Sequence, residues 1–231
     1  MSVIRMKTLE PSIAKRVAEL DTKVQAGQLE KLVHTIYHIK EIAGDTGGTK
    51  YLPSELNYFS IKTGQNDDNG FPTTYADTNM DSPSAISQGY YFWGQNIRVV
   101  ALHSKSDETP LIKTIDKTAL QKFFINDIGK VFEDGVLTIE VADKPLVRIA
   151  PIMSCPSGMG LKVASVFGDG TFANANFENS DSIMSNSRPF DLWLENNLTF
   201  KFRINYPTSK KIYNSFRLGC FIDGILYRPR A

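Results

Sequence analysis

The chain has 231 residues, 26 Lys and Arg against 25 Asp and Glu, 42% hydrophobic residues and two cysteines. This composition indicates a folded protein with a sizeable core, and it excludes a disulfide-stapled miniprotein and a largely disordered chain. The apolar runs are far shorter than the ~20 residues of a membrane-spanning helix. Residues 1–15 lack the apolar stretch of a secretory signal, so a reducing compartment is the expected location.

Helical periodicity dominates the N-terminal part of the chain. Apolar residues recur at spacings of three and four on both sides of Gly27, at Ile13, Val17, Leu20, Val24, Leu29, Leu32, Val33, Ile36, Tyr37 and Ile39. Such spacing is typical of an amphipathic helix, and Gly44, Gly47 and Gly48 would end it. The pattern predicts a helical arm over residues 1–50, formed by one broken helix or by a pair.

The period changes to two after Lys50. The candidate strands are Leu56–Thr63, Gly89–Gly94, Asn96–His103, Leu111–Ile115, Gln121–Asn126, Val136–Val141, Pro145–Ala150, Leu161–Phe167, Thr171–Phe177, Phe190–Leu194, Leu198–Tyr206 and Phe216–Tyr227. Turn residues such as Asp134-Gly135 and Asp223-Gly224 separate them, and only Lys117–Val131 suits a helix equally well. Residues 51–231 are therefore predicted to form one mainly antiparallel β-sandwich or barrel.

Charge is distributed unevenly. Residues 51–200 carry 11 basic and 18 acidic side chains, whereas residues 201–231 carry seven basic and one acidic. The C-terminal cations are Lys201, Arg203, Lys210, Lys211, Arg217, Arg228 and Arg230. Two interpretations stay open: a solvated sheet face or edge protected by cations, or a surface that meets phosphate or an acidic neighbouring subunit.

Candidate metal-ligating residues are few. His34 and His38 are four residues apart, a spacing that on a helix can place two imidazoles on one metal. A third ligand is missing, and Thr35 stands where zinc hydrolases have a glutamate, so surface or interface histidines are the favoured interpretation. The acidic loop Asn66–Asn69 does not have the EF-hand spacing and is predicted to be a turn.

Catalytic motifs are also missing from the sequence. Ser157-Gly158 does not form a Gly-x-Ser-x-Gly elbow, and Gly158-Met159-Gly160 lacks the third glycine of a phosphate loop. Cys155 and Cys220 have no activating neighbour in the sequence and are predicted to be small buried side chains. We therefore expect no catalytic, cofactor-binding or metal-ligating residues, no cofactor and no enzymatic activity.

Four contiguous aromatic residues occupy Tyr90–Trp93. Alternation on a strand would send Tyr90 and Phe92 to one face and Tyr91 and Trp93 to the other. This pattern predicts a central strand covered on both sides, or a strand that also meets a neighbour. A sugar-stacking platform is the alternative.

Five segments together have the order of features found in one family. They are Thr78-Asn79-Met80, Gly89 to Val99 (GYYFWGQNIRV), Arg188-Pro189-Phe190, Leu198 to Phe202 (LTFKF) and Gly224 to Pro229 (GILYRP). In this order residues 55–230 resemble the jelly-roll capsid proteins of tailless icosahedral bacterial viruses.

The resemblance implies a jelly-roll shell protein of a bacteriophage, with the N-terminal helix facing inward or clasping a neighbour. About 180 residues are few for sixteen strands, which favours a single jelly roll over the double form that many such proteins have. The expected partners are copies of the chain and other virion proteins, with non-specific contact to packaged nucleic acid or an internal membrane left open and no small-molecule substrate. The implied location is the virion, after assembly in the host cytoplasm.

Two other hypotheses compete with a major or minor capsid protein. One is a β-sandwich module that binds carbohydrate or a host receptor through aromatic side chains such as Trp93 or Trp193. The other is an enzyme with a scattered carboxylate pair, which no motif supports. Self-association of the purified protein discriminates between the first two.

Overall fold

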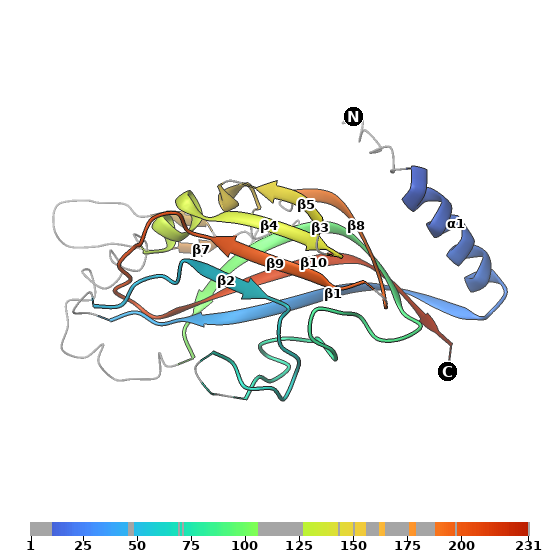
Figure 1. Ribbon diagram of the computed structural model, residues 1–231, viewed down its shortest axis with the longest axis horizontal. Coiled ribbons are helices and arrows are strands. Elements are labelled where there is room, and N and C mark those ends of the chain that lie inside the picture. The colour runs from blue at the N-terminus through green and yellow to red at the C-terminus, as the bar shows by residue number, and fades with distance from the viewer. Residues whose placement is uncertain are drawn as a thin grey trace.

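Two four-stranded antiparallel sheets form the body of the protein (Figure 1). The computed structural model describes residues 11–45, 49–68, 70, 72–105, 127–142, 144–149, 151–155, 162–164, 176–178, 188–196 and 198–230. The first sheet has the order β1 (Leu29–Ile42), β10 (Phe216–Pro229), β3 (Tyr91–His103) and β8 (Arg188–Glu195). The second has the order β2 (Glu55–Tyr58), β9 (Phe200–Asn205), β4 (Val136–Val141) and β5 (Lys144–Ile149).

The remaining elements are short. A two-stranded hairpin pairs β6 (Lys162–Ala164) with β7 (Asn176–Glu178), and a 3-10 turn η2 covers Ile152–Ser154. Residues 127–134 are helical, and buried Val131 packs into the core from them. The helix α1 (Pro11–Gln25) precedes β1, and Gly27 makes the turn between them with a φ of 72°.

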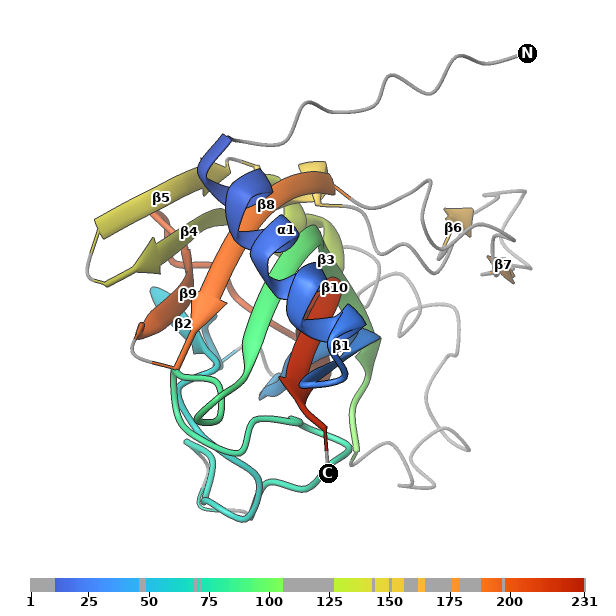
Figure 2. The ribbon, with the colours of Figure 1, turned by 90° about the vertical axis from the view of Figure 1, so that its right-hand side faces the viewer.

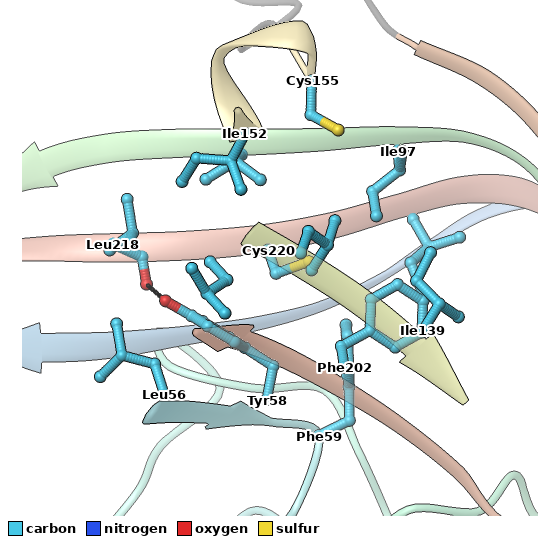
Figure 3. Close-up of a cluster of buried hydrophobic side chains, with 14 of the residues drawn as sticks. Leu56, Tyr58, Phe59, Ile97, Ile139, Ile152, Cys155, Phe202, Leu218 and Cys220 are labelled. Atoms are coloured by element: carbon cyan, nitrogen blue, oxygen red, sulfur yellow. Dashed lines mark hydrogen bonds between the residues drawn. The ribbon is translucent and has the colours of Figure 1, made fainter. Parts of the chain in front are cut away.

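The core lies between the two sheets, because strands such as β9 and β4 bury alternate residues. Phe202 and Ile139 from the second sheet lie in it with Ile97 and Cys220 from the first (Figure 3). The Tyr58 hydroxyl donates to the Leu218 carbonyl at 3.2 Å, so one hydrogen bond also joins the sheets inside the core (Figure 3). The two packed antiparallel sheets confirm the prediction of a mainly antiparallel β-sandwich.

Residues 29–39 are not helical, so the predicted helical arm over residues 1–50 is wrong for this segment. They belong to β1, which pairs with β10 along its whole length, so residues 29–42 are part of the sandwich rather than of a helical arm. Two polar residues interrupt the alternation of apolar and polar residues that would have identified this strand in the sequence. His38 and Lys40 occupy inward positions of β1 that a strand pattern would fill with apolar residues.

The predicted strands Gly89–Gly94 and Asn96–His103 form the single strand β3. Asp223-Gly224, predicted to be a turn, lies inside β10 at a bulge opposite Gly94. A Cβ at Gly224 would lie 2.1 Å from the Trp93 carbonyl oxygen, so the two backbones approach each other here as only glycine permits. β3 is central in its sheet, as the aromatic run predicted.

The predicted strands Leu111–Ile115 and Gln121–Asn126 lie outside the described residues, as does the loop Ser157–Gly160. The other candidate strands overlap β2 and β4 to β10, and Val136–Val141 matches β4 at both ends. The helical alternative for the end of Lys117–Val131 agrees with the helical residues 127–134.

Candidate functional site

The two outer faces of the sandwich differ in chemistry. On the second sheet, β9 and β4 alternate between fully buried apolar residues and outward polar ones such as Lys201, Arg203, Thr138 and Glu140. Arg203 forms ion pairs with Glu140 and, at 3.7 Å, with Glu55 across neighbouring strands. This face is suited to contact with water.

The outer face of the first sheet carries an apolar row across all four strands. The register aligns Val33 of β1 with Ile225 of β10, Ile225 with Trp93 of β3, and Trp93 with Trp193 of β8. Ile225, Trp93 and Trp193 each stand next to core residues, Leu226, Phe92 and Leu194, and Val33 is strongly exposed, so the four side chains point away from the core. We call them the outer-face row.

The helix α1 covers one end of this face (Figure 2). Arg16 pairs with Glu195 of β8, and its guanidinium lies 5.7 Å from the centre of the Trp193 ring. Ile13 and Leu20 are the buried residues of the helix. The α1 helix therefore shields Trp193 from water at the β8 end of the row.

Asp21 fixes the other end of α1. Its carboxylate accepts from Lys31 at 2.8 Å and from the Tyr227 hydroxyl at 3.2 Å. The hydrogen bond to Asp21 raises the pKa of Lys31 against the opposing effect of burial. At the β1 end of the outer-face row, Val33 stays 88% exposed. The row is thus covered at one edge of the sheet and open at the other.

The attachment of α1 can be tested by replacing Leu20 with alanine. A 15-residue helix is marginal in water without tertiary contacts. Loss of one of its two buried side chains should raise amide hydrogen exchange in residues 11–25 at least tenfold while the strands keep their protection. Glu19→Ala, at an exposed position of the same helix, is the matched control. Equal exchange in both variants would show that α1 does not depend on this contact.

A buried ion pair lies next to the outer-face row. Arg98 of β3 donates to Asp223 of β10 twice, at 2.6 and 2.8 Å, and stacks over the Phe221 ring at 5.0 Å. The Thr35 hydroxyl donates to the same carboxylate at 2.7 Å. These contacts tie β1, β10 and β3 together on their outer side.

A cavity of about 600 Å³ opens at the edge of the sandwich, beside the second half of β1. Lys40 in its wall is almost completely buried and pairs with Asp68 at 2.6 Å. Asp77 pairs with Lys105 at 2.5 Å. The cavity wall carries as many basic side chains as carboxylates: Lys40, Lys50, Lys105 and Arg217 against Glu41, Asp67, Asp68 and Asp77.

His38 lies at this cavity and is deeply buried. Its Nδ1 accepts from the Phe59 backbone N–H at 2.6 Å, so this nitrogen carries no proton in the fold. Burial, reinforced by nearby Lys40, lowers the pKa of His38 to about 4. Phe59 itself has a φ of 61°, so the hydrogen bond holds a backbone conformation that phenylalanine rarely adopts.

The two histidines do not form a metal site. They lie on strand β1, where four residues span about 13 Å, too far for one metal ion. Among the residues that the structure describes, no three His, Cys, Asp or Glu side chains are placed to hold a metal. In the Asn66–Asn69 loop, Asp68 pairs with Lys40, and a backbone hydrogen bond from Gly70 to Asp67 closes a turn.

Cys155 and Cys220 form no disulfide and are completely buried, which confirms the prediction of small buried side chains. Burial raises the pKa of the Cys220 thiol, so it stays protonated and unreactive at neutral pH. The two cysteines are 65 positions apart in the chain. The fold places both in the core (Figure 3).

Several C-terminal cations bind carboxylates of the same chain. Arg228 pairs with Glu30, Lys210 with Asp134, and Arg203 with Glu140. These pairs favour the interpretation of a solvated, edge-protecting strip over that of a phosphate-binding surface.

Sequence alone could not have identified the outer-face row. Its four residues come from four strands that are far apart in the chain, and only the strand order aligns them. No helix among the described residues is long and apolar enough to cross a membrane. Comparisons with protein-family models, curated proteins and solved structures find no match.

Proposed function

We propose that the chain is a single jelly-roll coat protein that assembles with copies of itself into the icosahedral shell of a tailless bacterial virus. The observation that carries the proposal is the strand order. If the eight strands of the two sheets are numbered consecutively, one sheet reads 1-8-3-6 and the other 2-7-4-5. The first strand thus pairs with the last, the second with the seventh, the third with the sixth and the fourth with the fifth.

This pairing corresponds to a long antiparallel hairpin rolled into two facing sheets. Eight strands in two such sheets are typical of jelly rolls, which occur in viral capsid and lectin domains. The hairpin of β6 and β7 falls between the fifth and sixth of these strands, as an insertion in one connection. The resemblance noted in the sequence supports the capsid alternative among these classes.

The surface chemistry is compatible with assembly. A shell subunit needs outer surfaces that other copies can cover. The outer-face row provides apolar area that is not needed for the core of one copy, and Val33 at its end is strongly exposed. The polar face of the second sheet would stay in contact with water.

Assembly is the test of this proposal. The purified protein should form trimers, hexamers or sheets as its concentration rises, measured by light scattering and by electron microscopy of the same samples. Subunit contacts with ionic components should weaken as salt increases. A protein that stays monomeric at millimolar concentration and low salt would contradict the proposal.

A carbohydrate-binding module is the second candidate, because Trp93 and Trp193 lie opposite each other on an outer face. Arg16 already lies over Trp193, so the helix competes with any sugar for that ring. A glycan array comparing the wild type with Trp93→Ala separates the two functions. Binding that is lost in the variant, by a protein that does not self-associate, would favour the lectin-like alternative.

A further inference from the structure

Strand β1 is an edge strand with one open side. Its register with β10 runs without a shift from Leu29 opposite Pro229 to Ile42 opposite Phe216. The backbone N–H groups of Tyr37 and Ile39 point away from β10, because they donate to Asn79 Oδ1 at 2.9 Å and to the Asp77 carbonyl at 2.7 Å. Since backbone groups alternate along a strand, all odd-numbered residues of β1 direct theirs to the open side.

Only half of this open side is capped, in the sense that residues 77–79 form hydrogen bonds with its backbone groups. Besides the two bonds above, Asn79 Nδ2 donates to the Thr35 carbonyl at 2.7 Å, and the Thr78 hydroxyl donates to the Tyr37 carbonyl at 3.1 Å. The cap ends at Thr35. Within the described part of the chain, no hydrogen bond reaches the edge-facing backbone groups of Lys31 and Val33.

The uncapped half lacks the usual protection of an edge strand. Proline, a bulge or an unpaired lysine commonly prevents edges from pairing. Here the segment has no proline or bulge, and Lys31 is bound to Asp21. Val33 is 88% exposed, more than the other large exposed hydrophobic residues, Tyr75 at 69% and Tyr51 at 51%. An open backbone edge beside an exposed β-branched residue fits an added β-strand.

We propose that residues 29–35 of β1 pair antiparallel with the same residues of a second copy of this chain, around a twofold axis at Leu32. The proposal rests on the proposed function, because it names one contact through which copies would assemble. The pairing would join the first sheets of two copies into one continuous eight-stranded sheet.

The uncapped backbone groups of Lys31 and Val33 favour the register with the twofold axis at Leu32. With the axis at Leu32, Lys31 of each copy lies opposite Val33 of the other, so the pairs nearest the axis use only uncapped backbone groups. An axis at Lys31 would place two lysines opposite each other, which is unfavourable. An axis at Val33 would place Thr35, whose carbonyl already accepts from Asn79, in the pairs next to the axis, whereas an axis at Leu32 leaves Thr35 at the end of the paired segment.

The side chains suit the same register. The alkyl part of Lys31 would cover Val33 of the other copy on the outer side of the sheet. Glu30 would lie opposite His34, a carboxylate facing an imidazole rather than a like charge. A contact of about seven residues a side is smaller than a standard stable interface of roughly 1,600 Å². It would therefore add to other contacts, and its detection needs a covalent trap.

A single cysteine at position 32 provides this trap. Even-numbered residues of β1 occupy the non-hydrogen-bonded positions of the new pairing, where opposite side chains are closest. Under mild oxidation with copper phenanthroline, Leu32→Cys should form at least ten times more disulfide-linked dimer than Val33→Cys. Val33→Cys is a stringent matched control, because position 33 is more exposed than position 32. Random collisions between molecules would therefore crosslink Val33→Cys more than Leu32→Cys. The native cysteines are buried and should not react.

A second variant tests the pairing without cysteine. Val33→Pro removes the edge-facing N–H but no hydrogen bond of the β1–β10 ladder, whereas Val33→Ala keeps this N–H. Light scattering should show at least fivefold weaker association for Val33→Pro than for Val33→Ala. Circular dichroism should show the same fold for both.

The outcomes separate this pairing from the shell function. Equal or stronger crosslinking through Val33→Cys would overturn the register, and unchanged association of Val33→Pro would overturn the edge contact. If large assemblies form in either case, the shell function stands and the edge pairing does not. If Leu32→Cys gives dimers but no larger assembly forms, the edge pairing stands and the shell function fails.

Discussion

Asp223→Ala is expected to lower the free energy of unfolding by about 3–5 kcal/mol, because it removes the carboxylate that pairs with the buried Arg98 side chain. The Arg98 side chain is only 8% exposed, and it donates two hydrogen bonds to the Asp223 carboxylate. The Thr35 hydroxyl would lose its acceptor as well. Urea unfolding at pH 7, followed by tryptophan fluorescence, measures the change.

The double variant Arg98→Met/Asp223→Ala is the control for this interpretation. Methionine keeps the contact with Phe221 but removes the charge, so the double variant should be more stable than Asp223→Ala alone. Glu195→Ala provides a second comparison, because its partner Arg16 is 48% exposed and the loss should be below about 1 kcal/mol. A double variant less stable than Asp223→Ala would mean that the packing of Arg98, and not its charge, dominates.

The second large effect is a loss of stability in mild acid, caused by His38. Its pKa is about 4 in the fold, below the ordinary value of 6.5, because burial and Lys40 disfavour the imidazolium. Between these two values the unfolded chain binds more protons than the folded one, so stability falls as pH decreases from 6.5 to 4. The loss should reach about 3 kcal/mol by pH 4, since each unit of pKa corresponds to about 1.4 kcal/mol.

His38→Gln should abolish most of this dependence. The glutamine oxygen can accept the Phe59 N–H, and the side chain cannot be protonated in this range. Urea unfolding at pH 7, 6, 5 and 4 compares the two proteins. His34→Gln is the matched control, because burial and Arg228 also lower the pKa of His34, but its ring is less deeply buried. An unchanged pH dependence in His38→Gln would assign the acid sensitivity to other groups.

Asp77 titrates in a separate and lower range. Burial alone would raise its pKa, but hydrogen bonds from Lys105 and Thr74 outweigh that effect and hold the pKa below the ordinary value of an aspartate. Its contribution to stability is therefore present above the ordinary aspartate range and is lost only as pH falls through its lowered pKa. The interval between pH 6.5 and 5 reports mainly on the histidines.

Local patterns predicted those strands whose inward residues are all apolar. Val136–Val141 and Phe200–Asn205 alternate between buried apolar and outward polar residues, and a period of two is visible without any tertiary information. The same rule failed for β1, because Lys40 and His38 stand at inward positions. Their partners, Asp68 and the Phe59 amide, lie more than 20 residues away in the chain.

Two further features, the bulge at Asp223-Gly224 and the outer-face row, depend on the pairing of strands that are far apart in the chain. Asp223-Gly224 has the composition of a turn, and only the opposing Gly94 shows that it is a bulge within a strand. The outer-face row likewise depends on β10 lying between β1 and β3. Pairings between distant segments carry no local signal, so neither feature could be predicted from composition or spacing.

The central place of β10 has a consequence for synthesis. Residues 216–229 are translated after β1 and β3, yet they hold these two strands together, so the first sheet cannot close before this segment leaves the ribosome. Until then β1 and β3 lack the neighbour that joins them. Nascent chains on one messenger therefore expose the unpaired edges of β1 and β3 to one another until β10 is made.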